Sequence, residues 1–460
     1  MSNSSAARQR IAKLLDAHSC VEIGAAVHAR ATDFNPHPAE ESSDGVITGY
    51  GLIEDSLVYV YSQDASVLGG SIGEMHARKI TRMYDMAIRT GAPVIGLIDS
   101  AGLRLQEGMD ALDAVARIYA KQAAASGQIP QISAVFGRCG GSLAVAASMC
   151  DFTLMENGAH LFVNAPNTLA GNREEDNDTS SAASRAAAGV ADYTGTEDEV
   201  LGKVRELVGI LPSNFEDIAE ADCEDDMNRS CPGIAANAAD PAAVFAEAAD
   251  DGKFVEIRKD FAPEMVTGFV RLGGTTAGVF GTRSEQLTAN GCTKAAALVR
   301  FCDAFGLPVV SLTNVNGFAA SIGEENLEGS AAAALTMALA RASVPKINVI
   351  SKKAMGSAYA VMNAKATGAD FTFAFPGAVI GIMDAAMAAR VIAPVSDTVT
   401  FESTRKRYEE TQCSLAGAAS RGLVDRIVEP SDLRRYLIGA LEVLYTKRVD
   451  TPAGKHGSRS

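Results

Sequence analysis

Short blocks of apolar residues alternate with polar turns along this chain, and they predict strands and helices in turn. In the first half, apolar spacing predicts a helix over 8–19, a strand hairpin over 44–63 and a strand over 93–98. In the second half, it predicts strands near 254–257 and 265–280, helices over 294–305 and 330–341 and a strand over 308–313. Strands that alternate with helices indicate an α/β fold.

One stretch, residues 129–155, shows the strand-to-helix pattern most clearly. It opens as a β-branched run, passes through Gly137, Gly140 and Gly141, and continues from Ser142 in small residues that favour a helix. Glycines at such a turn let the backbone approach a ligand closely, and free N–H groups at a helix start can stabilise an anion. The stretch therefore predicts a turn that binds an oxyanion at the end of a strand.

The same pattern recurs over residues 344–374. Gly141 matches Gly356 and Ser142 matches Ser357, both 215 positions later. Further pairs keep the same order in both halves, among them 48–50 with 267–269 and 21–23 with 255–257. We therefore predict a duplication. The predicted organisation of the chain is a domain over 1–215, an acidic solvated linker over 216–240, a domain over 241–445 and a flexible tail over 446–460.

Composition narrows the function. The formal net charge of −15 makes nucleic-acid binding unlikely, because that function needs a basic face. No apolar run reaches the length of a membrane span, and the N-terminus lacks the apolar segment of a signal peptide, so we expect a cytoplasmic protein. The histidines and cysteines show no metal-ligand spacing, so no metal site is expected and a Ser-His-Asp hydrolase is disfavoured.

Two segments of the first half resemble ligand loops. Gly69, Gly70 and Ser71 precede a predicted helix that carries Arg78 and Lys79, which could hold a phosphate-bearing ligand; a plain helix cap with a solvated basic face explains them equally well. The segment DSAGLRLQEG, residues 99–108, follows a predicted strand, where ligand loops of α/β folds lie.

The order of several motifs is more specific than any one of them. Gln63-Asp64, Gly69-Gly70-Ser71, DSAGLRLQEG, IPQISAVFGRCGGS and VPKINVISKKAMGSAYAVMNAK follow one another, and together they resemble the carboxyltransferase subunits of biotin-dependent acyl-CoA carboxylases and decarboxylases. That group includes the propionyl-CoA carboxylase beta and methylmalonyl-CoA decarboxylase alpha chains. The resemblance covers roughly residues 8–445. It implies two crotonase-like (ClpP/crotonase) spiral domains in tandem, assembled as a homo-oligomer, usually a hexamer with active sites between subunits.

The resemblance also implies a reaction, which moves a carboxyl group between biotin and the α-carbon of an acyl-CoA. By analogy, backbone amides near Gly140, Gly141 and Ser142 would hold the thioester enolate, and those of Ser357 and Ala358 the ureido oxygen of biotin. No side-chain acid or base is required if biotin itself accepts the proton. The residues expected to bind the substrate are Gly69, Gly70, Ser71, Arg78, Ala101, Gly102, Arg104, Tyr359 and Ala360.

The chain lacks a biotin-attachment sequence, so biotin would arrive on a separate biotin carboxyl carrier protein. A biotin carboxylase or a membrane decarboxylase subunit is the further partner that the family offers. Carboxylation, decarboxylation and transcarboxylation all stay open. Two other readings also stay open: a biotin-independent crotonase-type enzyme such as a hydratase or thioesterase, and a catalytically silent scaffold.

One departure from the family affects the expected substrate. An acidic or bulky residue usually follows the tyrosine of the second turn, where this chain has Ala360. A methyl group leaves room that an acetyl or propionyl group would not fill. We therefore expect an acyl group larger than propionyl, or one with a polar terminus that Ser357 or Asn363 can hydrogen-bond.

Overall fold

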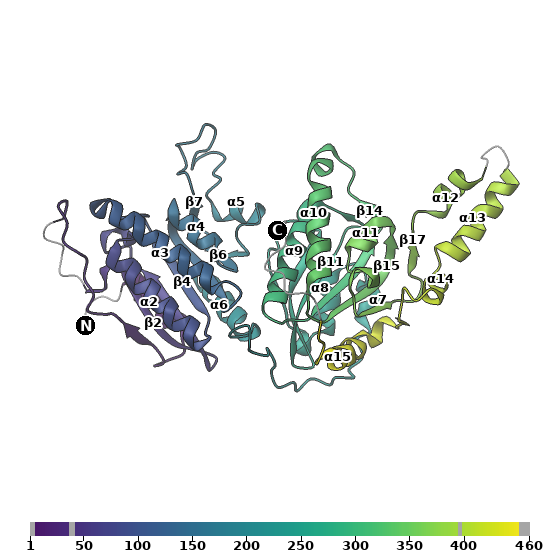
Figure 1. The fold of residues 1–460 in the computed structure, drawn as a ribbon, viewed down its shortest axis with the longest axis horizontal. Helices are drawn as coiled ribbons and strands as arrows, with labels where there is room; N and C mark the ends of the chain where they lie inside the picture. Colours follow the sequence, from purple (N-terminus) through teal and green to yellow (C-terminus); the bar gives the residue numbers. More distant parts are fainter. Residues whose placement is uncertain (1–4, 36–41, 394–397, 450–460) are drawn as a thin grey trace. The chain divides into compact units, whose positions relative to one another are not determined.

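The protein is described by a computed structural model that covers residues 5–35, 42–393 and 398–449. Contacts divide the chain into two units, the first ending at Ile218 and the second beginning at Ala219. Each unit has its own sheet, its own hydrophobic core and its own covering helices (Figure 1).

The first unit is a mostly parallel sheet covered by helices. Its strands are β1 (Val21–Ile23), β2 (Val46–Ile53), β3 (Ser56–Gln63), β4 (Val94–Ser100), β5 (Gln131–Gly140), β6 (Phe152–Glu156), β7 (His160–Phe162) and β8 (Tyr193–Gly195). Its helices are α1 (Ala6–Leu14), α2 (Glu74–Thr90), α3 (Met109–Ala125), α4 (Ser142–Ser148), α5 (Ala182–Ala187) and α6 (Glu197–Ile210). The pair α2 and α3 packs together over the sheet (Figure 1).

The second unit repeats this plan. Its strands are β9 (Phe254–Glu256), β10 (Met265–Leu272), β11 (Thr275–Thr282), β12 (Gln286–Leu287), β13 (Val309–Val315), β14 (Gly317–Phe318), β15 (Lys346–Met355), β16 (Phe371–Ala374), β17 (Val379–Gly381) and β18 (Arg426–Ile427). Its helices are α7 (Gly233–Asn237), α8 (Pro241–Ala248), α9 (Ala289–Ala304), α10 (Ile322–Arg341), α11 (Gly356–Val361), α12 (Ala385–Ile392), α13 (Thr398–Gln412), α14 (Leu415–Ser420) and α15 (Leu433–Leu444).

The two sheets have the same topology. The first runs in the order β1-β2-β3-β4-β5-β6-β8 with β7 on β5, and the second runs β9-β10-β11-β13-β15-β16-β18 with β17 on β15. In both, the first three strands are antiparallel and the others are parallel. The duplication predicted from the sequence is therefore present in the strand order.

The duplication extends to single hydrogen bonds. The Thr48 hydroxyl donates to the Ile23 carbonyl oxygen at 2.8 Å, and the Thr267 hydroxyl donates to that of Ile257 at 3.0 Å. The central strands β5 and β15 both begin and end 215 residues apart. These matches explain why equal spacing in the sequence identified the corresponding turns.

The predicted elements differ from the observed ones mainly at their ends. The helix expected over 294–305 begins earlier, at Ala289, because the Thr288 hydroxyl caps it by accepting from the Gly291 amide. The helix expected over 330–341 begins at Ile322, capped by Ser321. The run 265–280 forms two strands joined by the turn at Gly273 and Gly274, where φ is +61° and +86°.

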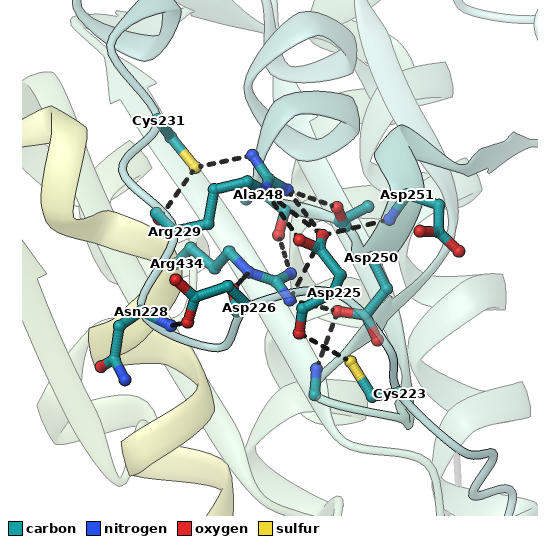
Figure 2. Close-up of polar contacts among 12 residues, drawn as sticks. Cys223, Asp225, Asp226, Asn228, Arg229, Cys231, Ala248, Asp250, Asp251 and Arg434 are labelled. Atoms are coloured by element: carbon teal, nitrogen blue, oxygen red, sulfur yellow. Dashed lines mark hydrogen bonds and ion pairs between the residues drawn. The ribbon is translucent and has the colours of Figure 1, made fainter.

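The segment expected to be a solvated linker, 216–240, is in large part ordered against the second unit. Arg434 of α15 is fully buried and lies 2.7 Å from the Asp250 carboxylate and 3.5 Å from that of Asp225 (Figure 2). Arg229 donates to Asp225 and to the carbonyl oxygen of Ala249. Asp225 of the acidic run thus pairs with the buried Arg434 and with the partly buried Arg229, which charge patterning alone did not indicate. The tail over 450–460 lies outside the described residues.

Candidate active site

The first glycine turn joins the central strand β5 to the short helix α4. Gly141 holds this turn in a left-handed conformation, with φ +59° and ψ −120°, which favours glycine. Its amide donates to the Phe162 carbonyl oxygen at 2.8 Å and is therefore already paired. The amides of Ser142 and Leu143 come next, at the helix start, where no carbonyl of the helix can pair with them. These two amides are the best-placed oxyanion donors of the turn.

A hydrogen bond from α3 fixes the carbonyl group of Ser142. Its carbonyl oxygen accepts a hydrogen bond from the Tyr119 hydroxyl at 2.5 Å. Its own hydroxyl oxygen is buried and has no hydrogen-bond partner among the described residues. The backbone of the turn is thus held from α3, while one polar atom stays available.

The predicted ligand loops meet at this turn. The Ala101 amide donates to the Gly69 carbonyl oxygen at 2.9 Å, and the Ser100 hydroxyl donates to that of Gly70 at 2.6 Å. A side chain added at Gly102 would come within 3.6 Å of the Gly140 carbonyl oxygen. The structure therefore brings together Gly69, Gly70, Ser71, Ala101, Gly102, Gly140, Gly141 and Ser142.

The three expected cations of this region have different surroundings. Arg78 is exposed on α2, with Glu74 at 3.4 Å. Lys79 is buried and donates to the Ser43 carbonyl oxygen at 3.1 Å, and burial lowers the pKa of Lys79 to about 8. Arg104 is only 2 % exposed and is ion-paired with carboxylates. Of the three, only Arg78 presents its charge to solvent.

The second glycine turn has a positive φ at the matching glycine. It joins β15 to α11 through Gly356, where φ is +61°. Ser357 is exposed, whereas Ala358 is buried. A side chain at Gly356 would come within 3.2 Å of the Ile382 carbonyl oxygen, so the chain passes close to the turn here.

A pocket of about 360 Å³ lies beside the second turn. Gly356, Ser357 and Tyr359 form one wall, and residues 380–382 at the end of β17 form another. The helical region closes the pocket with Tyr408, Gln412, Ala418, Arg421 and Leu423. The lining mixes apolar side chains with a few polar ones, as in many small-molecule sites. Burial raises the pKa of Tyr359, so its hydroxyl stays protonated near neutral pH.

Near this pocket, Asn363 does not have the role expected from the sequence, and Arg421 was not predicted to lie there. Asn363 is fully buried and donates to the Ser311 hydroxyl at 3.1 Å, so it does not reach a substrate and the suggestion that it binds the acyl terminus is wrong. Arg421, which lines the pocket, was assigned no role from the sequence. The helices that carry the far wall contain no motif, and their position depends on tertiary packing. Ala360 is exposed, one residue beyond Tyr359.

Comparison with known proteins decides the family. The family described as carboxyl transferase domain matches residues 2–458. The chain belongs to this family. The propionyl-CoA carboxylase beta chain of Saccharopolyspora erythraea is 37% identical over 491 residues, covering 98% of this chain and 90% of that protein. The methylmalonyl-CoA decarboxylase subunit alpha of Veillonella parvula is 35% identical over 473 residues, covering 98% and 92%.

A solved structure supports the same assignment. Transcarboxylase 12S, described as a hexamer assembly with hydrolysed methylmalonyl-CoA bound, has 32% sequence identity and a TM-score of 0.93 over 98% of this chain and 92% of its own. The resemblance to carboxyltransferase subunits and the tandem crotonase-like α/β fold are thereby confirmed. No helix in the described part of the chain is long and apolar enough to cross a membrane.

Proposed function

We propose that this carboxyltransferase moves a carboxyl group between biotin, carried on a separate protein, and the α-carbon of an acyl-CoA. The observation that carries the proposal is the pair of matching turns, with φ of +59° at Gly141 and +61° at Gly356, each at the end of a central strand. The reaction develops negative charge on two oxygens, and two sets of backbone donors can stabilise both.

In the first unit, the amides of Ser142 and Leu143 face the thioester oxygen and stabilise the enolate that forms at the α-carbon. Gly140 and Gly141 shape this turn. Ala101 and Gly102, together with the turn at 69–71, form the surface on which the acyl-CoA lies. Arg78 supplies a cation for a CoA phosphate, because its charge is exposed.

In the second unit, the amides of Ser357 and Ala358 face the ureido oxygen, and the adjoining pocket holds the ring system. A volume of about 360 Å³ is ample for a fused bicycle, and the apolar wall at Ile380 and Leu423 suits its aliphatic side. When bound, carboxybiotin supplies the carboxyl group, or biotin accepts it in the reverse direction. Tyr359 and Ala360 border the space for the acyl chain.

The active unit is a homo-oligomer in which the acyl-CoA turn of one copy meets the biotin turn of another. Apolar side chains beside the second turn support this. Ile382 lines the pocket and is 71% exposed, and on α12 Met387, Val391 and Ile392 are 60%, 81% and 62% exposed. An apolar face of this kind suits burial against a second copy. A biotin carboxyl carrier protein is the further partner, and a cytoplasmic location remains a prediction.

The test is decarboxylation of methylmalonyl-CoA in the presence of free biotin, followed by mass spectrometry of the CoA esters. Biotin-dependent loss of the carboxyl group is expected. Ser142→Pro removes one amide donor at a helix start, where proline is tolerated, and should lower the rate by roughly 10²–10³-fold. Ala6→Pro is the matched control, because Ala6 is also the first residue of a helix. Turnover that does not depend on biotin would favour a biotin-independent crotonase-type enzyme, and no turnover of any acyl-CoA would favour a silent scaffold.

A further inference from the structure

A buried ion-pair cluster around Arg104 lies beneath the loops of the first unit. The Arg104 guanidinium lies 2.6 Å from the Asp44 carboxylate and 2.8 Å from that of Glu107. It also donates to the Ser71 carbonyl oxygen at 2.8 Å. One side chain thus connects the turn at 69–71 to the segment that follows Gly102.

Both carboxylates of the cluster have a second attachment. Asp44 accepts from the His76 amide at 2.9 Å, and Glu107 accepts from the Glu74 amide at 2.6 Å. Those two amides belong to the first turn of α2. The cluster also leaves no room at Gly73, where a side chain would come within 2.2 Å of the Glu107 carboxylate.

The duplicated second unit has the same backbone without the cluster. The Arg104 amide donates to the Ile72 carbonyl oxygen at 2.9 Å, and the corresponding Ala319 amide donates to that of Leu287 at 2.7 Å. At the spacings of the duplication, alanine replaces Arg104 and Pro263 replaces Asp44. Glu324 takes over one contact of Glu107, since it accepts from the first amide of α9, that of Ala289, at 2.6 Å. The fold therefore forms without a buried arginine at this position and without the carboxylate of Asp44, so the presence of the Arg104–Asp44 pair in one unit needs another reason.

The loops that the cluster connects also contact the first glycine turn. Gly69 and Gly70 are bonded to Ala101 and Ser100, and Gly102 adjoins Gly140. We propose that Arg104, paired with Asp44 and Glu107, is a positioning residue that sets the two loops against the first glycine turn and so aligns the acyl-CoA for carboxyl transfer. The inference rests on the proposed function. It also gives Arg104 a role other than direct contact with CoA.

The experiment compares Arg104→Lys with Arg434→Lys in the full-length chain. Both arginines are buried and each contacts two carboxylates; Figure 2 shows those of Arg434, which belongs to the other unit. Asp250, its partner, accepts from the Gly273 and Gly274 amides in the β10–β11 turn, at the amino end of the parallel strands. Lysine keeps the charge of each arginine but loses the planar fork that bridges two partners.

Two measurements are made on each variant. In the decarboxylation assay, Arg104→Lys should lower kcat/KM for the acyl-CoA by roughly 10–10²-fold and leave KM for free biotin unchanged, because a shift of the loops misplaces one substrate only. Arg434→Lys should change neither value by more than about twofold. In hydrogen exchange, Arg104→Lys should speed the exchange of amides in 69–76 and 101–108 selectively, while Arg434→Lys should leave them protected.

The outcomes separate this inference from the proposed function. Equal exchange in these loops for wild type and Arg104→Lys would overturn the positioning role, as would parallel changes in KM for both substrates. An inactive wild type would count against the proposed function alone, since the exchange comparison still decides the role of Arg104. If Arg104→Lys does not fold, Arg104→Met combined with Asp44→Asn and Glu107→Gln removes the buried charges together and is measured in the same way.

Discussion

Gly141 and Gly356 both have a positive φ, +59° and +61°, and lie 215 residues apart, each where a central strand gives way to a helix. The two turns differ in their surroundings. A side chain at Gly141 would meet nothing within 4 Å, whereas one at Gly356 would come within 3.2 Å of a carbonyl oxygen. Gly141 therefore offers the cleaner test of the backbone conformation itself.

We expect Gly141→Ala to lower kcat for carboxyl transfer by roughly 10²-fold, because relaxing the strained φ moves the adjoining amides away from the enolate oxygen. The loss of stability should be roughly 1–3 kcal/mol, because φ +59° with ψ −120° lies outside the regions that alanine normally populates. Gly306→Ala is the matched control, since Gly306 has φ +69° and equally free space but lies outside both turns. A full-rate Gly141→Ala enzyme would show that this turn does not bind the reacting oxygen.

The positions of the turns were predictable because glycine and β-branched residues carry local information. Because the pattern occurs twice, the constant spacing between the two copies also identified which strands correspond. Which amides are free was not predictable, because Gly141 pairs with Phe162 of β7, a strand that returns only after an intervening helix and strand.

Arg104 illustrates a second limit of sequence interpretation. An arginine in a loop after a strand suggests a phosphate ligand, and nothing local indicates that Asp44 lies beneath it, 60 residues earlier. The far wall of the pocket is similar, because Tyr408 and Gln412 lie on α13, whose sequence has no motif. Long-range packing decides both features.

The charge of Arg78 provides a test of CoA binding. Its side chain is 61% exposed, so Arg78→Glu should leave the fold intact and weaken the binding of a CoA ester. The effect should shrink as salt rises, because exposed charges are screened. Arg82→Glu, an exposed position one turn further along α2, is the control. Equal affinities of the Arg78 variant and the wild type at low salt, measured by calorimetry, would remove Arg78 from the site.

Asp151 predicts a specific pH dependence of stability. Its carboxylate accepts from the Gln131 amide at 2.8 Å, and burial raises its pKa from 3.8 to about 7. The folded state then holds a proton that the unfolded state has released between about pH 4 and pH 7. The contribution of Asp151 to stability is therefore fully present below pH 4 and is lost as pH rises through 7. Each pKa unit corresponds to roughly 1.4 kcal/mol.

Asp151→Asn should remove that dependence, and the melting temperature at pH 8 relative to pH 5 should rise against wild type. Asp370, the matching residue of the second unit, accepts from the Lys346 amide at 2.7 Å and also pairs with Lys447 at 2.8 Å. Asp370→Asn is the contrasting variant, which should destabilise the protein at both pH values because it removes an ion pair. A pH profile of Asp151→Asn that matches wild type would show that Asp151 titrates at an ordinary pH.

The apolar face of α12 predicts how the protein assembles. Val391 is 81% exposed, so Val391→Asp should leave the isolated unit folded while placing a charge in the proposed interface between copies. We expect a smaller species in analytical ultracentrifugation and a specific activity that falls on dilution. Val443→Asp, at a 70% exposed position on α15, is the control and should leave the assembly unchanged. An unaltered sedimentation profile for Val391→Asp would place the interface elsewhere.

The size of the acyl group is tested at Ala360. Its side chain is exposed beside the turn. Asn363 is excluded as a ligand by its burial, so of the two polar residues suggested from the sequence Ser357 remains to contact an acyl terminus. In a fitted pocket, one methylene more or less changes the ratio of kcat/KM between two substrates by roughly 10–200-fold, which corresponds to about 1–3 kcal/mol. Ala360→Ile should therefore shift kcat/KM toward shorter acyl-CoA esters by that order, while Ala366→Ile, at another exposed alanine of the same unit, should not. A flat chain-length profile for Ala360→Ile, or acetyl-CoA as the best substrate of the wild type, would contradict the argument that the small side chain enlarges the acyl site.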